Sequence, residues 1–203
     1  MPKGENMNLH KELPSSLHQL EVDMKSCEQT QGQSVYQHGV SVNEYFQDLI
    51  GENTLNWKKP KWFEENKLKI LDLLYDTEII ERYILYHDCG KPYNKVIYED
   101  GSIHFPDHAL VSEKVWNNLF DNKLIGSLIK NDMFFHTCTS KELEEFTKEQ
   151  DKEFVFVLLV VALCELHSNS NMFGGMDTIS FKSKWKKLDR RGNQVCRFFF
   201  TST

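Results

Sequence analysis

The chain has 203 residues, of which 40% are hydrophobic and 27% charged, and its formal net charge is −6. This length suits one sizeable domain. The negative charge argues against broad, nonspecific nucleic-acid binding, which requires a basic surface. Five cysteines without a CxxC pair predict reduced thiols in a cytosolic compartment.

The two ends of the chain and its most apolar run set the expected domain organisation. The start lacks the apolar core of a signal peptide, so we expect a cytoplasmic protein with a loosely ordered segment over residues 1–15. The most apolar run, residues 154–164, is too short to span a bilayer and predicts a buried helix, without membrane contact. We expect residues 16–203 to form a single helical domain that includes a basic C-terminal helical tail.

The spacing of apolar residues predicts a mainly helical, all-α fold. The expected helices cover residues 17–27, 35–50, 62–75, 78–87, 106–120, 123–136, 140–147, 151–168 and 181–199. Thr139 and Glu142 form a potential capping box. Residues 28–34 are polar and favour a loop. Residues 95–105 predict one small β-hairpin, because Asp100-Gly101 suits a type I′ turn between two β-prone runs.

Side chains that can bind metal occur on several of these predicted helices. His87 and Asp88 are adjacent at a predicted helix end, and imidazole with carboxylate suits divalent first-row metals. Asp132 and His136 stand four residues apart and are expected on one helix face. The remaining candidates are His38, His108, Glu165 and His167. Helices that each present one such side chain make the metal sites of helical bundles.

Three strings of this sequence resemble the HD-domain metal-dependent phosphohydrolase superfamily. They are QHGVSV at residues 37–42, YHDCGKP at 86–92 and DHALVSEKVW at 107–116, and HDxGK is the most specific part. The resemblance covers roughly residues 34 to 170. It implies a helical HD-type bundle, hydrolysis of phosphate esters, and one or two divalent transition-metal ions such as Mn, Fe, Co, Ni or Zn.

The resemblance also implies which residues bind the metal. His38 matches the first ligand, and His87 and Asp88 match the central pair. His108 and His136 resemble the two further histidines of bimetallic members. The last acid is Asp132 or Glu165. Asp132 is slightly favoured because it is an aspartate one turn from His136, whereas Glu165 stands where the family often has the shorter aspartate.

Catalytic and substrate-binding roles follow from the residue types. A metal lowers the pKa of bound water, and the metal-bound hydroxide would attack phosphorus. Asp88 would bridge two metals or orient the nucleophile, Lys91 would hold a phosphate oxygen, and His108 or His136 would protonate the leaving oxygen. Candidates for substrate contact are Asn171, in a polar loop at residues 168–175, and Lys182 and Lys184 in the basic tail.

These features together predict a phosphohydrolase, either a phosphomonoesterase or a phosphodiesterase. The expected substrate is a nucleotide or another phosphate ester, including a nucleic-acid end. Two alternatives remain. One is a di-iron oxygenase on the same scaffold, which the extra histidines permit. The other is a non-catalytic nucleotide-sensing module, which the departure at Glu165 keeps open.

Overall fold

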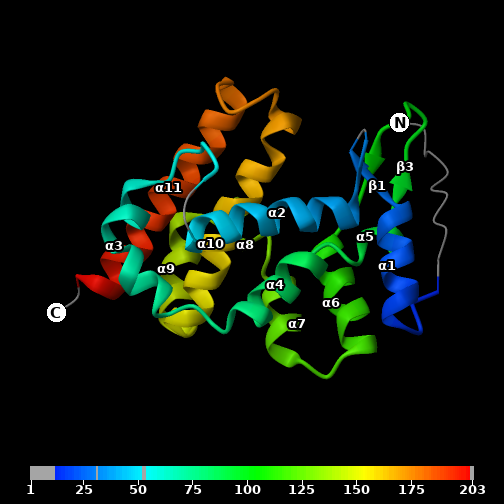
Figure 1. The fold of residues 1–203 in the computed structure, drawn as a ribbon, viewed down its shortest axis with the longest axis horizontal. Helices are drawn as coiled ribbons and strands as arrows, with labels where there is room; N and C mark the ends of the chain where they lie inside the picture. The colour runs from blue at the N-terminus through cyan, green and yellow to red at the C-terminus, as the bar shows by residue number, and fades with distance from the viewer. Residues whose placement is uncertain (1–11, 31, 52–53, 202–203) are drawn as a thin grey trace. The chain divides into compact units, whose positions relative to one another are not determined.

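The computed structural model describes residues 12–30, 32–51 and 54–201, and these are mainly helical (Figure 1). The expected all-α class with a small hairpin over residues 95–105 is therefore confirmed. The segment expected to be loosely ordered is residues 1–15, and residues 1–11 of it lie outside the described residues.

The chain divides into two compact units, each built from two stretches of sequence. The first unit comprises Met1–Val40 and Arg82–Asn131, and the second comprises Ser41–Glu81 and Asp132–Thr203. Helix α2 (Val35–Ile50) and helix α4 (Thr77–Tyr86) each contribute residues to both units. A single domain over residues 16–203 stays a prediction.

The first unit begins with helix α1 (Leu17–Ser26), whose first turn is capped by the Ser16 hydroxyl accepting from the Gln19 backbone N–H. A short antiparallel hairpin of β1 (Glu28–Thr30) and β2 (Gln33–Ser34) follows. The prediction of a loop over residues 28–34 was therefore wrong. Gly32 adopts a φ of 78° in the turn, which a side chain would disfavour. The strands are too short and polar to show an alternating apolar pattern.

The predicted hairpin lies between two helices in the chain order of the first unit. Helix α5 (Lys91–Asn94) precedes β3 (Val96–Ile97) and β4 (Ile103–His104), which pair antiparallel. Gly101 provides the positive φ of the turn, at 80°. Helix α6 (His108–Leu119) packs on α5 and on α7 (Lys123–Lys130). The one-turn helix α5 was not predicted; it starts where Pro92 can occupy the first turn without losing a hydrogen bond.

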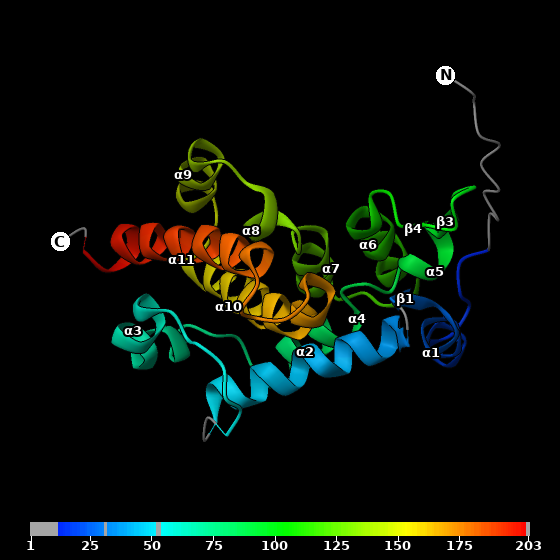
Figure 2. The ribbon, with the colours of Figure 1, turned by 90° about the horizontal axis from the view of Figure 1, so that it is seen from above.

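The second unit is centred on helix α10 (Lys152–Ser168), most of whose residues are buried. Helix α11 (Ile179–Phe200) lies along it, as Figure 2 shows, and also contacts α3 (Lys61–Leu71), α8 (Phe134–Thr137) and α9 (Ser140–Glu149). A 3₁₀ turn, η1 (Asn169–Phe173), links α10 to the loop before α11. The predicted capping box of Thr139 and Glu142 is present at the start of α9.

The most apolar helix of the chain is buried, as expected. By length and composition alone, Lys152–Phe173 could cross a membrane, but 78% of its apolar window is buried inside the structure. The core helix of a globular protein passes the same test. Burial around the whole circumference of α10 is what an all-round apolar helix requires in a protein interior.

One long helix predicted from the sequence is interrupted in the structure. The expected helix over residues 123–136 ends at Lys130, and α8 begins at Phe134 after a turn. The Asn131 side chain donates to the Ser127 carbonyl, so it competes with continued helical bonding. The prediction that Asp132 and His136 share one helix face was therefore wrong, because Asp132 lies in the turn between the two helices.

Candidate metal centre

Five of the predicted site residues lie together in the first unit. His38 comes from α2, His87 and Asp88 directly follow α4, Lys91 opens α5, and His108 opens α6. Side chains from four segments of the chain therefore lie close together. His38, His87 and Asp88 are almost fully buried, with exposed fractions of 0%, 1% and 2%.

The Asp88 carboxylate is the centre of this group. Its Oδ2 atom lies 3.3 Å from Nε2 of His87 and 3.8 Å from Nε2 of His38. Its Oδ1 atom lies 3.5 Å from Nε2 of His108. Three imidazoles therefore direct the same ring nitrogen toward one carboxylate. We call His38, His87, Asp88, Lys91 and His108 the Asp88 cluster.

Backbone carbonyls define the tautomers of two of these histidines. Nδ1 of His87 lies 2.6 Å from the Ile84 carbonyl oxygen, and Nδ1 of His108 lies 3.2 Å from that of Phe105. A carbonyl only accepts, so both rings carry their proton on Nδ1. In the neutral ring Nε2 then has a lone pair, and that lone pair faces the Asp88 carboxylate. This is how a metal-binding histidine is normally oriented.

The donor set and its spacing fit a divalent transition metal. Ligand atoms that each lie about 2.1 Å from one ion are about 3.0–3.4 Å apart. The separations of 3.3, 3.5 and 3.8 Å around Asp88 are close to this range and long for hydrogen bonds.

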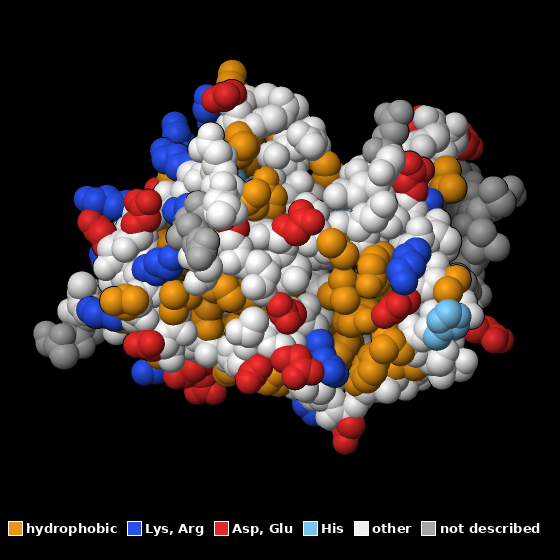
Figure 3. Space-filling view, viewed as in Figure 1, with side chains coloured by type: hydrophobic (Ala, Val, Ile, Leu, Met, Phe, Trp, Pro, Cys, Tyr) orange, Lys and Arg blue, Asp and Glu red, His pale blue; other side chains and the backbone are white. Residues whose placement is uncertain are grey.

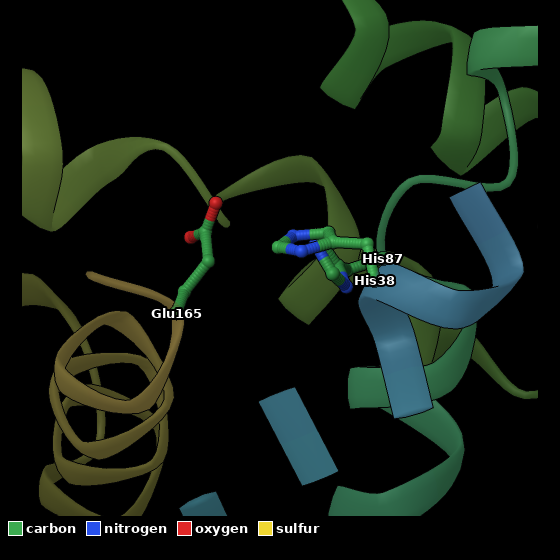
Figure 4. A group of neighbouring side chains, drawn as sticks. All are labelled: His38, His87 and Glu165. Atoms are coloured by element: carbon green, nitrogen blue, oxygen red, sulfur yellow. The ribbon is translucent and has the colours of Figure 1, made fainter. Parts of the chain in front are cut away.

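His38 and His87 are a buried pair that could hold a metal ion. Each offers one ligand atom, and the two atoms lie within 4.8 Å of each other. Their rings meet edge to face, with centroids 5.2 Å apart. Figure 4 shows the two rings together, the first from α2 and the second from the end of α4.

Lys91 supplies the positive charge next to Asp88. Its ammonium donates to Asp88 Oδ2 at 2.5 Å and to Gln29 Oε1 at 2.9 Å, and the residue is only 8% exposed. Burial opposes ionisation of Asp88, but the Lys91 ammonium beside it holds the pKa of that carboxyl well below its usual range. Asp88 is therefore ionised at neutral pH, as a metal ligand must be.

Two glycines let the helices approach closely enough to form the Asp88 cluster. A Cβ on Gly39 would lie 2.6 Å from the Leu85 carbonyl oxygen, and one on Gly90 would overlap the Ser112 backbone. Each glycine is next to or near a cluster residue, His38 or Asp88. Asp107 adopts a left-handed φ of 50° and turns the chain into α6 immediately before His108.

The second unit holds the other predicted ligands. His136, in α8, pairs with Glu165 of α10, with Nε2 and Oε2 2.8 Å apart. Burial disfavours the charged imidazole, but Glu165, together with Asp132, raises the pKa of His136 above its usual value. Asn169 also donates to Glu165, at 3.4 Å. Figure 4 shows the Glu165 carboxylate near the end of its helix. Which of Asp132 and Glu165 is the last ligand stays a prediction.

The predicted substrate-binding residues of the second unit are exposed. Asn171 lies in η1, where its carbonyl accepts from the Gly174 N–H. Lys182 pairs with Asp177 at 3.3 Å, and Lys184 lies over the Phe173 ring at 5.0 Å. Lys and Arg side chains gather over α3 and α11 in Figure 3. Arg191 of the same basic tail is buried and donates to the Phe135 and Cys138 carbonyls, so its role is structural.

One member of the site was not predicted from the sequence. Gln29 accepts a hydrogen bond from Lys91, and it stands in the hairpin that was expected to be a loop. No residue pattern around Gln29 indicates this contact, since 62 positions separate the two residues.

Comparison with known proteins finds no counterpart: no protein-family model, no curated protein and no solved structure matches the chain.

Proposed function

We propose that the protein is a metal-dependent phosphohydrolase that cleaves a phosphate ester of a nucleotide or of a nucleic-acid end. The observation that supports this most directly is the Asp88 cluster, in which three imidazole Nε2 atoms and one ammonium surround a single buried carboxylate. Such a donor set favours a first-row divalent cation.

His38, His87 and Asp88 are the proposed ligands in the first unit. A divalent cation bound there would lower the pKa of a water molecule and polarise a phosphoryl oxygen. Asp88 provides the negative charge, and Lys91 keeps it ionised. The Ile84 carbonyl orients the His87 ring, which removes the cost of orienting the ligand on binding.

His108 differs from the two buried histidines in its exposure. Its side chain is 21% exposed, whereas that of His38 is fully buried. An imidazole that lies near the carboxylate and also reaches solvent suits contact with a second ion or with a substrate. We therefore propose that His108 is the member of the Asp88 cluster that contacts the phosphate ester and that, once its Nε2 is protonated, it donates that proton to the leaving oxygen.

Metal analysis tests this proposal. The full-length protein should retain Mn²⁺, Fe²⁺, Co²⁺, Ni²⁺ or Zn²⁺ after desalting and hydrolyse an aryl phosphate, a nucleotide or a phosphorylated oligonucleotide with that ion. His87→Ala should lower metal affinity at least tenfold, because it removes a ligand. His18→Ala is the matched control, since His18 is exposed in the same unit and should leave metal affinity unchanged.

The same measurements distinguish the alternatives. Protein that binds none of these metals would contradict the proposal and favour the non-catalytic nucleotide-sensing module. Two irons per chain with oxygen consumption, and no hydrolysis, would indicate a di-iron oxygenase. Metal content of Asp132→Asn and Glu165→Gln decides the last acid, since only the true ligand should lower the metal-to-protein ratio when it is replaced.

A further inference from the structure

The second unit contains a pocket of about 310 Å³ near the start of α11. Its volume is at the lower end of the range for small-molecule sites, about 300–1,000 Å³. All the residues that line it belong to the second unit, and none is a proposed metal ligand. The pocket therefore shares no residue with the Asp88 cluster.

The rim of this pocket is positively charged. Lys58, Lys182 and Lys186 line it, against one carboxylate, Asp177. Asp177 lies 3.3 Å from Lys182 but is fully exposed, so this ion pair is weak and an incoming anion can replace it. Lys182 also stands in the first turn of a 22-residue helix, where the helix dipole favours negative charge.

The wall of the pocket is aromatic. Trp185 lines it, and the ammonium of Lys58 lies 4.4 Å from the centroid of the indole ring. A ligand held here would meet an aromatic surface and an ammonium group together. Aromatic rings gain about 0.5–1.5 kcal/mol from contact with one another beyond the burial of their area.

The pocket wall also contains a buried acceptor, on His167. Its Nδ1 lies 2.8 Å from the Leu163 carbonyl oxygen, whereas its Nε2 has no hydrogen-bond partner among the described residues. The ring is completely buried, and burial lowers the pKa of His167 to about 4, so the ring is neutral at pH 7. In the neutral ring Nε2 can accept a hydrogen bond from a ligand N–H or O–H but cannot hold an anionic group, so the anion site lies at the lysines and not at His167.

From these features we propose that the pocket binds a small planar aromatic anion, such as an aryl sulfonate, phosphate or carboxylate. The anionic group lies between Lys182 and Lys186, where it replaces the Asp177 carboxylate. The ring lies against Trp185. Recognition of this kind needs both parts of the ligand, because neither the exposed lysines nor one indole alone holds a ligand strongly.

Calorimetric titration of the full-length protein with naphthalene-1-sulfonate in metal-free buffer tests the proposal. This probe has no hydrolysable ester, so the result is independent of the proposed phosphohydrolase activity. We expect binding of naphthalene-1-sulfonate and at least tenfold weaker binding of 1-naphthol and of inorganic sulfate. If 1-naphthol bound as tightly as naphthalene-1-sulfonate, the proposed role of charge would be overturned. If naphthalene-1-sulfonate did not bind, the proposed site would be overturned.

Two variants with opposite expected effects on affinity make the test specific to this pocket. Lys186→Ala should weaken binding about tenfold, the loss expected for one charge-assisted hydrogen bond. Lys187→Ala is the matched control, because Lys187 is exposed on the same helix but lies outside the pocket. Asp177→Asn should strengthen binding several-fold, because it removes the competing carboxylate. If Lys186→Ala and Lys187→Ala have the same effect, binding occurs elsewhere and the proposal fails.

Discussion

Asp88 is a carboxylate that is buried together with the positive charge that stabilises it. Its exposed fraction is 2%, and an isolated ionised carboxylate would be very costly at such a position. Lys91 lies three residues further along the chain, and the turn after α4 brings its ammonium to within 2.5 Å. Asp88 and Lys91 thus form a buried ion pair, in which the charge of each residue reduces the free-energy cost of burying the other.

Replacing Lys91 tests this dependence. In metal-free protein, Lys91→Met should lower the free energy of unfolding by about 3 kcal/mol, since it leaves a buried carboxylate without its closest cation. The measurement is urea unfolding at pH 7, followed by circular dichroism.

Lys114→Met is the control for Lys91→Met. Lys114 is exposed on α6 of the same unit, so its replacement should change the free energy of unfolding by less than about 0.5 kcal/mol. Equal effects of the two substitutions would show that Lys91 is not needed to balance Asp88.

At the scale of elements, the spacing between helices decides whether the cluster can form. Gly90 packs so closely on α6 that its N–H donates to the Ser112 hydroxyl at 2.8 Å. Gly39 packs equally closely on the backbone of α4 at Leu85. Neither glycine has a positive φ, so each is required for space rather than for backbone conformation.

Gly90→Ala should therefore destabilise the protein by about 1–3 kcal/mol, the usual cost of overpacking, and should also weaken metal binding by displacing Asp88. Gly126→Ala provides the comparison, because its added methyl would meet only the movable Asn117 side chain. Thermal unfolding and metal affinity should change little in Gly126→Ala. A Gly90→Ala protein with unaltered metal affinity would contradict the importance of this close contact.

Across the whole molecule, buried titratable groups connect stability to pH. Burial lowers the pKa of His167 to about 4, from an ordinary value of 6.5. Burial would raise the pKa of Asp48, but bonds from the Leu55 N–H, the Trp57 indole and Lys59 lower it to about 2. Both folded-state pKa values are depressed, so each group contributes stability at neutral pH that is lost on acidification.

The pH range over which His167 affects stability differs from that of the carboxylates. Its contribution is complete above pH 6.5 and is lost as the pH falls toward 4, by about 2–3 kcal/mol given the shift in its pKa. Urea unfolding of the parent between pH 7 and pH 4 should show this decline, and His167→Phe should show a shallower one. Parallel pH profiles for the two proteins would contradict it.

The sequence by itself determined most helices and the hairpin at residues 96–104, and it predicted the first-unit side chains that are proposed as ligands. Apolar periodicity specifies α2, and a continuous apolar run specifies the buried α10, because each helix makes its backbone hydrogen bonds within its own segment. The histidines at 38, 87 and 108 and Asp88 were identifiable because imidazole and carboxylate are the side chains that bind such metals.

Only the tertiary structure decided which of these side chains meet and what supports them. The break between α7 and α8 falls at Asn131, whose side chain bonds locally to the Ser127 carbonyl, and apolar spacing does not show it. Gln29 reaches Lys91 through a polar hairpin without a sequence pattern. The buried position of Lys91 and the space required at Gly90 arise from the packing of segments that are distant in sequence. The pattern of residues along the chain does not show how closely such segments approach in space.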